Sequence, residues 1–372
     1  MKNNTMSVLF AADDDSHLND LTIRRTAASL PFGGRYRLID FALSNLVNAN
    51  ITTVGIVTKN NYNSLMDHIR MGRDWDLNRK NSGITVFPPF VFNSAHDVYK
   101  GKIDALYTLR GYMMKALEEY VVIANTNIAF NIDFEEVEKF HIEKNADITV
   151  LTYKTDEYTP KKNIVKVDKN QRITDMRYPV DADSKKKQLC NLNIYFIKKD
   201  LLINLIDNAY AYGSYDFEKD ILQKKLADLY IMSYEVTDYV AVIDRIPTYF
   251  KHSMDLLDSK VREELFYKYS TIYTKVKDSV PTKYKEGAEV KNSLIADGCV
   301  IDGIVENSVL FRSVRVGKGA VVKNCIIMED GIIMENASLE YTITDKNVII
   351  QPGRKLCGTD TYPMVVVKGK TV

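Results

Sequence analysis

The sequence predicts a Rossmann-like α/β domain followed by a parallel β-helix of hexapeptide repeats. Three observations support this fold class. Short apolar runs alternate with helix-like segments over about the first 250 residues, a polar stretch follows, and aliphatic residues then recur six positions apart. We therefore divide the 372-residue chain into an α/β domain at 1–252, a connecting arm at 253–288 and a β-helix at 289–372.

The α/β domain is predicted from alternating strand and helix patterns. Strand-like apolar runs lie at Ser7–Ala11, Ile51–Val57, Tyr120–Ala124, Ile148–Tyr153, Asn191–Ile197 and Ile231–Val236. Helical patterns lie at Asp40–Asn48, Asp104–Leu117, Glu135–Lys144 and Asp216–Asp228. This alternation predicts a mostly parallel sheet covered by helices, with ligands bound beyond the carboxyl ends of its strands.

The β-helix is predicted from a six-residue spacing of aliphatic side chains at Leu310, Val316, Val322, Met328 and Met334. In such coils, each hexapeptide forms one flat face of a triangular turn. The spacing begins at Leu294 and Val300, is interrupted, and resumes at Ile343 and Ile349 in a shifted frame. A stacked coil has open ends, and we expect the tail Tyr362–Val372 to supply one edge.

Composition restricts the class of partner. Lys and Arg number 50 against 49 Asp and Glu, for a net charge of +1, so we expect no nucleic-acid partner. No run of about 18 apolar residues occurs and Met1–Ser7 lacks a signal-peptide pattern, so we expect no membrane partner. The four cysteines are dispersed, without a Cys-x-x-Cys pair, which favours a reducing cytoplasm and disfavours a zinc site.

Five ordered sequence blocks resemble those of bacterial ADP-glucose pyrophosphorylases, also called glucose-1-phosphate adenylyltransferases. The blocks lie at Pro31–Asn48, at His68–Gly72 with Trp75–Arg79, at Tyr99–Ala105, at Ser214–Asp220 and at Met254–Leu257. The resemblance covers nearly the whole chain. It implies a GT-A-like nucleotidyltransferase domain, a left-handed β-helix and a tetramer. It also implies Mg²⁺-dependent synthesis of ADP-glucose from ATP and glucose 1-phosphate, for glycogen.

The sequence departs from this family first at the Gly-rich loop that wraps the triphosphate. The matching stretch, Phe10–Leu18, contains no Gly, so side chains obstruct the close approach of the backbone. Its three consecutive aspartates, Asp13–Asp15, place negative charge where a triphosphate would lie. The expected remnants of the nucleotide pocket are Ala11, Ala12, Asp13, Gly101 and Asp104.

The second departure concerns the two aspartates that hold Mg²⁺ in the family. Their positions fall on Asn127 and, counted back from the Met254 block, on Val242. An amide carries no charge and valine cannot bind a metal, so we expect this chain to bind no metal or cofactor. Asp244, two residues further on, would be the substitute if the register were shifted, and Mg²⁺ would then be the cofactor of a rebuilt site.

The third departure concerns the positive charges of the pocket. A family lysine falls on Ala27, and the Glu-Lys pair that grips glucose 1-phosphate falls on Arg177 and Tyr178. Arg177 could still bind phosphate, whereas Tyr178 lacks the positive charge. We expect Arg177, Asn193 and Asp216 as remnants of the sugar-phosphate pocket.

Loss of the Gly-rich loop, the metal-binding aspartates and the positive charges of the pocket predicts a catalytically silent subunit. Catalysis by this family depends on positioning and on neutralising charge. The pattern resembles the non-catalytic regulatory subunit of Gram-positive bacteria, which implies a heterotetramer with a catalytic homologue. Such a subunit acts by favouring one state of the assembly. Arg24, Arg25 and Arg37 are candidate contacts to a phosphorylated effector.

Three alternatives remain open at this point. One is an active adenylyltransferase whose carboxylates would be Asp104, Asp216 and Asp244. Another is a stand-alone sugar-phosphate sensor. The third, an acyltransferase, is disfavoured because it needs a histidine in or near the coil, and all five histidines precede Val290.

Overall fold

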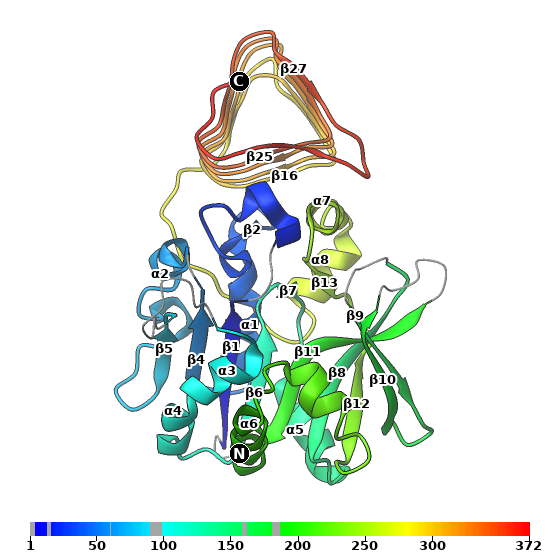
Figure 1. Cartoon of the computed structure of the whole chain (residues 1–372). Helices are drawn as coiled ribbons and strands as arrows, with labels where there is room; N and C mark the ends of the chain where they lie inside the picture. The colour runs from blue at the N-terminus through cyan, green and yellow to red at the C-terminus, as the bar shows by residue number, and fades with distance from the viewer. Residues whose placement is uncertain (1–3, 13–15, 60, 90–98, 158–161, 181–186) are drawn as a thin grey trace.

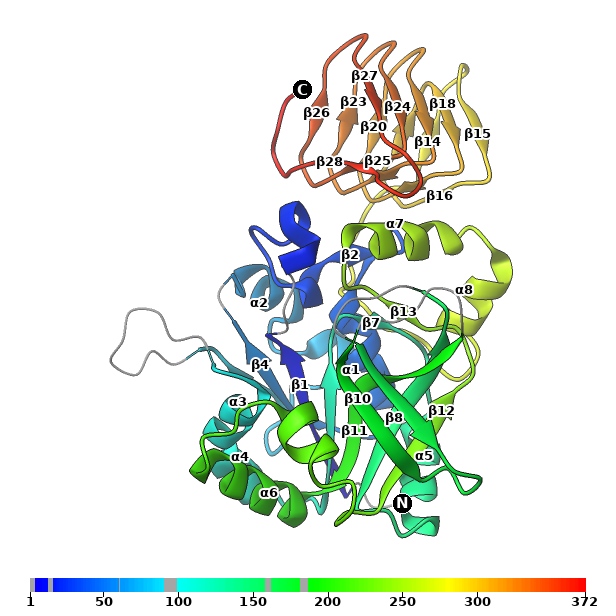
Figure 2. The ribbon, with the colours of Figure 1, turned by 45° about the vertical axis from the view of Figure 1, so that its right-hand side comes forward.

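The computed structural model describes residues 4–12, 16–59, 61–89, 99–157, 162–180 and 187–372. An α/β domain carries a triangular β-helix on one end (Figure 1). Figure 2 shows the successive coils of the β-helix side by side. Within the described ranges, no helix is long and apolar enough to span a lipid bilayer.

The central sheet has nine strands, with one half parallel and the other half mixed. The parallel half contains β1 (Thr5–Ala11), β4 (Thr53–Thr58), β5 (Gly83–Phe87) and β6 (Tyr120–Asn125). The other half contains β8 (Ile148–Thr155), β9 (Lys162–Val167), β10 (Ile173–Val180), β11 (Gln188–Lys198) and β12 (Ile231–Val236). β11 runs antiparallel to β6, β8 and β9, so the expected mostly parallel sheet is a mixed one.

Helices pack on both faces of this sheet and, at one end, beneath the β-helix. They are α1 (Leu38–Asn48), α2 (Asn63–Ile69), α3 (Lys102–Thr108), α4 (Arg110–Lys115), α5 (Phe134–Glu143), α6 (Lys199–Ala211), α7 (Ile246–Asp255) and α8 (Ser259–Phe266). The helix expected at Asp104–Leu117 is two helices, α3 and α4, that meet at Leu109. Of the helix expected at Asp216–Asp228, only Glu218–Gln223 is helical, as the π-helix η4.

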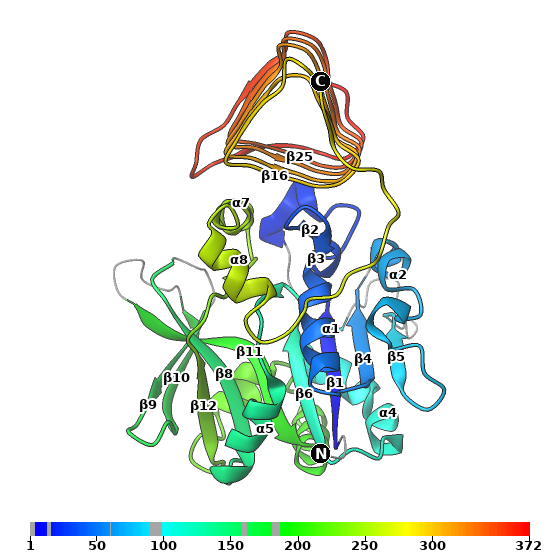
Figure 3. The same ribbon diagram turned by 180° about the vertical axis from the view of Figure 1, so that it is seen from behind.

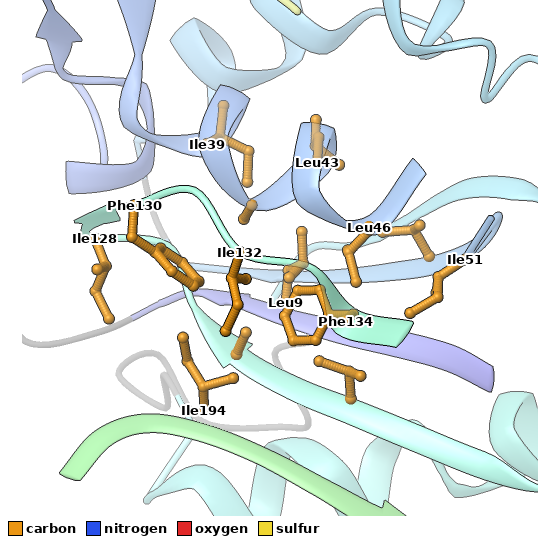
Figure 4. Packing of buried hydrophobic residues seen from close by; sticks show 14 of the residues in the cluster. Leu9, Ile39, Leu43, Leu46, Ile51, Ile128, Phe130, Ile132, Phe134 and Ile194 are labelled. Carbon is orange, nitrogen blue, oxygen red and sulfur yellow. The ribbon is translucent and has the colours of Figure 1, made fainter. Parts of the chain in front are cut away.

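Strand β1 contributes to two hydrophobic clusters, one on each face of the sheet, because its successive side chains point to opposite faces. Leu9 packs with Ile39 and Leu43 of α1 and with Phe130 (Figure 4). Phe10, pointing the opposite way, belongs to a second cluster with residues of α3 and α6.

Short elements connect these layers. They are the 3₁₀ turns η1 (Ser16–Leu21), η2 (Ala27–Ser29) and η3 (Arg73–Trp75), the hairpin β2 (Pro31–Phe32) and β3 (Tyr36–Arg37), and the pair β7 (Ile128–Ala129) and β13 (Ala241–Val242). The β7–β13 pair joins the end of β6 to the chain that leads into α7.

The β-helix consists of three parallel sheets of five strands each. One contains β14 (Lys283–Tyr284), β17 (Val300–Ile301), β20 (Arg315–Val316), β23 (Ile332–Ile333) and β26 (Ile349–Ile350). The second contains β15 (Glu289–Lys291), β18 (Ile304–Glu306), β21 (Val321–Lys323), β24 (Ser338–Glu340) and β27 (Lys355–Cys357). The third contains β16 (Leu294–Ile295), β19 (Val309–Leu310), β22 (Ile326–Ile327), β25 (Thr342–Thr344) and β28 (Met364–Val366). These sheets form the left-handed hexapeptide coil that the sequence predicts.

The six-residue spacing holds around only part of each turn. Leu310, Val316 and Val322 are buried in the coil, as expected, but the next residue in the register is Ile327, five positions on. The third corner is therefore one residue shorter, so the expected six-residue spacing shifts by one position there. Met334 consequently lies outside the coil, with 40% of its surface exposed.

The boundaries of the connecting arm also differ from the expectation. α7 runs across residue 252, and β14 already pairs with β17 inside the expected arm. The coil therefore begins at Lys283 rather than at residue 289. At the other end, β28 pairs with β25 and Thr371 bridges to Ile349, so the tail does supply an edge.

The third sheet of the coil packs against the α/β domain (Figure 3). Its outward residues Val309, Ile326 and Ile343 are fully buried and share one hydrophobic cluster with Tyr249 and Phe250 of α7. Burial of this apolar ladder fixes the β-helix on the domain.

Candidate functional site

A cavity of about 690 Å³ opens beyond the carboxyl ends of β1 and β6, where the sequence places the ligand site. We call it the central cavity. Phe10 and Ala12 border it from the end of β1, Gly101 from the start of α3, and Asn191 from β11. A residue with a side chain could not replace Gly101, because its Cβ would lie 2.3 Å from the carbonyl oxygen of Tyr215.

A buried ion pair crosses the floor of the central cavity. Lys102 Nζ lies 2.5 Å from Glu218 Oε1, with both side chains about nine-tenths buried. The Tyr195 hydroxyl donates to the same carboxylate at 2.9 Å, and the ammonium lies over the Phe10 ring at 5.5 Å. Although burial opposes ionisation, Lys102 and the hydrogen bonds keep the pKa of Glu218 below its ordinary value. The positive charge of Lys102 is thus already matched within the protein.

The two positions that the sequence assigns to the family's metal-binding aspartates both lie at the cavity wall. Val242 pairs with Ile128 across β13 and β7, and the Asn127 side chain donates to the carbonyl oxygen of Ile243 at 3.1 Å. Asp244 also borders the cavity, but its Oδ1 accepts from the Thr248 hydroxyl at 2.9 Å.

This set of donors does not fit Mg²⁺, which requires several oxygen ligands with negative charge. Among the described residues, no group of three or more His, Cys, Asp or Glu side chains is placed to hold a metal ion. The carboxylates of the active-enzyme alternative are also separated. Asp216 and Asp244 border the cavity, whereas Asp104 does not and accepts from the backbone N–H of Lys100 at 3.0 Å.

The structure brings most of the other expected site residues to the central cavity. Those that border it are Ala12, Gly101, Asn127, Tyr178, Asn193, Asp216 and Val242. Ala11 is the buried last residue of β1, and Asp13 lies outside the described residues, as do the other two aspartates of the loop.

Besides Asp104 and Ala11, two further expected site residues lie outside the central cavity. Ala27 is buried in the hydrophobic cluster beneath the β-helix, because η2 turns inward there. Arg177 points out from β10 and pairs with Asp175 at 3.2 Å on an exposed edge, so it is not a phosphate ligand of this cavity.

Sequence reasoning missed two lysines of the central cavity. Lys102 lies in the block Tyr99–Ala105, within which the sequence predicts only Gly101 and Asp104 as site residues. Lys162, buried on β9, donates to the Tyr153 hydroxyl, and burial lowers its pKa. Neither contact has a sequence signature, because Glu218 is distant from Lys102 along the chain and Tyr153 lies on a different strand from Lys162.

A second cavity, of about 120 Å³, lies between the α/β domain, the arm and the β-helix. We call it the interface cavity. Its basic side chains are Arg35, Arg37, Lys275, Lys277, Arg312 and Lys346. Its described acidic residues are Asp67 and Glu329. Although burial opposes ionisation, Lys346 and Lys277 lower the pKa of Glu329 to about 2. Cations exceed carboxylates here, which favours an anionic ligand.

The three arginines expected to contact an effector are separated in the structure. Arg37 borders the interface cavity and donates to the Ser64 carbonyl oxygen at 2.6 Å. Arg24 is exposed and borders neither cavity. Arg25 is buried in an ion pair with Asp345 of the β-helix, so the expectation that it contacts an effector is wrong.

Known proteins resemble the chain along its whole length. The family model described as nucleotidyl transferase matches residues 7–240, and the model described as GlmU-like, C-terminal hexapeptide matches residues 277–362. The glycogen biosynthesis protein GlgD of Bacillus subtilis is 38% identical over 95% of this chain and 92% of its own length.

Two proteins of Geobacillus stearothermophilus are also similar. Its glycogen biosynthesis protein GlgD is 39% identical over 99% of this chain and 97% of its own length. Its glucose-1-phosphate adenylyltransferase is 33% identical over 99% of this chain and 95% of its own length. With the mixed sheet, the cavity at the ends of β1 and β6 and the hexapeptide coil, these similarities establish that the chain belongs to the nucleotidyl transferase family of GlgD glycogen biosynthesis proteins and glucose-1-phosphate adenylyltransferases.

Proposed function

We propose that this chain is a regulatory, non-catalytic subunit that modulates a homologous glucose-1-phosphate adenylyltransferase during glycogen synthesis. The observation that carries the proposal is that Asn127 and Val242 both border the central cavity, at the positions that the sequence assigns to the family's metal-binding aspartates. Neither side chain supplies the charge that a metal-assisted transfer of an adenylyl group needs.

The charges of the central cavity support the same proposal. Transfer from a triphosphate depends on cations that face the phosphates, and loss of one such contact typically costs ~10²–10³ in rate. Here Lys102 is paired with Glu218, Lys162 contacts Tyr153, and Tyr178 stands where the family has a lysine. These losses compound, because each removes stabilisation of the same developing charge.

The interface cavity is a suitable site for the phosphorylated effector of a regulatory subunit. Arg37 comes from the α/β domain, Lys277 from the arm, and Lys346 from the β-helix. A ligand with several phosphate oxygens would contact all three parts and so stabilise one arrangement of them. Differential binding of this kind is what an effector needs in order to shift an assembly between states.

The proposed partner is a catalytic homologue, in a heterotetramer, in the bacterial cytoplasm. We propose no nucleic-acid or membrane partner, and no cofactor held by this chain. The similarity to both GlgD proteins and an adenylyltransferase supports a place beside that enzyme.

Assay of the purified chain alone tests its catalytic silence. With ATP, glucose 1-phosphate and Mg²⁺, we expect no ADP-glucose above the background of a protein-free reaction, and the catalytic homologue purified in parallel is the positive control. Robust turnover that falls on replacement of Asp216 or Asp244 by Asn would instead support the active-enzyme alternative. A silent chain that neither binds nor affects the homologue would support the sensor alternative.

A further inference from the structure

Five asparagines line the central cavity, and their pattern points to a ligand. They are Asn125, Asn127, Asn163, Asn191 and Asn193. Three of them are satisfied within the protein. Asn127 donates to Ile243, Asn191 donates to the Tyr195 hydroxyl at 2.8 Å, and Asn193 accepts from that hydroxyl at 3.1 Å.

The other two asparagines have unused hydrogen-bonding groups. Asn163 is only 4% exposed, yet neither its side-chain nitrogen nor its oxygen has a partner among the described residues. Asn125 is 7% exposed, and its Oδ1 likewise has none there. Buried polar groups are nearly always paired, so two such residues bordering one cavity indicate partners supplied by a ligand.

The balance of charge in the cavity identifies the class of that ligand. Its described lysines are Lys100, Lys102, Lys162 and Lys219, and its described carboxylates are Asp216, Glu218, Asp220 and Asp244. The two sets are equal in number, and Lys102 forms an ion pair with Glu218 inside the protein, which leaves three lining residues of each sign. No excess of positive charge is left among these residues to hold a phosphate.

We propose that the central cavity binds an uncharged, hydroxyl-rich ligand, either a free sugar or a nucleoside, through the amides of Asn163 and Asn125. Each amide offers two donors and one acceptor, which match hydroxyl groups that both donate and accept. The aromatic rings of Tyr99, Tyr178 and Tyr215 also line the cavity and offer faces to a sugar ring or a base. This ligand site is independent of whether the chain regulates a partner.

Calorimetric titration of the full-length chain tests the class of ligand. The probes are D-glucose and adenosine, each compared with its phosphorylated counterpart, glucose 1-phosphate or ATP with Mg²⁺. We expect one uncharged probe to bind at least about tenfold more tightly than its counterpart, and the probe that binds tells a sugar site from a nucleoside site. Equal or tighter binding of both phosphorylated probes, or no binding of either uncharged probe at 10 mM, would overturn the proposal.

Replacement of the unpartnered amides tests the location of the site. Asn163→Leu and Asn125→Leu should each weaken binding at least about tenfold while the melting temperature stays the same or rises, because each removes a buried unsatisfied polar group. Asn170→Leu, on the exposed turn after β9, is the matched control and should leave binding unchanged. Undiminished binding to both cavity variants would overturn the proposal. Because binding is measured without a catalytic partner, its failure would leave the regulatory proposal intact.

Discussion

Arg25 of the α/β domain forms a buried ion pair with Asp345 of the β-helix, 320 residues further along the chain. The side chains are 5% and 2% exposed. The pair lies within the hydrophobic contact that joins the two parts, so it links the region beneath the β-helix to the coil itself.

Replacing Arg25 by Met should therefore destabilise the whole chain. The change leaves the Asp345 carboxylate buried and unpaired, which typically costs about 3–5 kcal/mol of the free energy of unfolding. Urea denaturation followed by circular dichroism measures this loss. Arg24→Met is the control, because Arg24 is exposed and its loss should cost less than about 0.5 kcal/mol. Equal stability of the two variants would show that the ion pair does not hold the domains together.

Replacing Lys102 by Met should likewise destabilise the chain, by about 3–5 kcal/mol, because Glu218 would remain buried without its cation. The double variant Lys102→Met with Glu218→Leu should recover most of that loss, since an apolar pair needs no neutralisation. Urea denaturation of the single and double variants provides the measurement. Lys219→Met, an exposed neighbour, is the control. A double variant as unstable as the single one would contradict the assigned pairing.

Stability should fall in acid partly through Glu329. Its pKa is about 2 in the folded chain and 4.5 ordinarily, so its contribution is complete above pH 4.5 and is lost as the pH falls towards 2. Glu329→Gln should therefore be less stable than the natural chain at neutral pH, and the difference should shrink below pH 4.5. Unfolding free energies from pH 7 to pH 2.5 measure this. Glu335→Gln, at an exposed position, is the control, and an equal pH dependence of both variants would contradict the prediction.

Arg37 should carry part of the affinity for a phosphorylated effector. Loss of one charge-assisted hydrogen bond costs about 1.5–3 kcal/mol, so Arg37→Gln should weaken binding of a hexose bisphosphate at least about tenfold. Calorimetric titration measures the affinity, and Arg24→Gln should leave it unchanged because Arg24 lies outside the interface cavity. A larger loss of affinity in Arg24→Gln than in Arg37→Gln would instead indicate an effector site at the exposed turn that carries Arg24.

The sequence predicts the β-helix well because its signal is local. Each coil places one aliphatic side chain in the interior at every flat face, as Val316 and Val322 show. The exposure of Met334 could not be predicted, because it depends on a corner of the coil that is shortened by one residue. The paired aliphatics Val309-Leu310 and Ile326-Ile327 do carry a further signal. One residue of each pair fills the coil and the other packs on the domain.

The candidate site could be predicted only where it follows the family motifs. The motifs place Gly101, Asn127 and Tyr178 at the cavity because strand ends converge there. They do not reveal that Lys102 meets Glu218, or that Arg25 meets Asp345, because these contacts join segments more than 100 residues apart. Only the packing of sheet, helices and coil brings such charges together.

The rate of ADP-glucose synthesis by a catalytic homologue from the same organism, measured with and without this chain, tests the central claim most directly. The account predicts that the chain alone is silent, that it co-purifies with the homologue, and that its addition changes the maximal rate or the response to a phosphorylated effector. An enzyme whose rate and effector response are the same in its presence and absence, with no complex formed, would contradict the account.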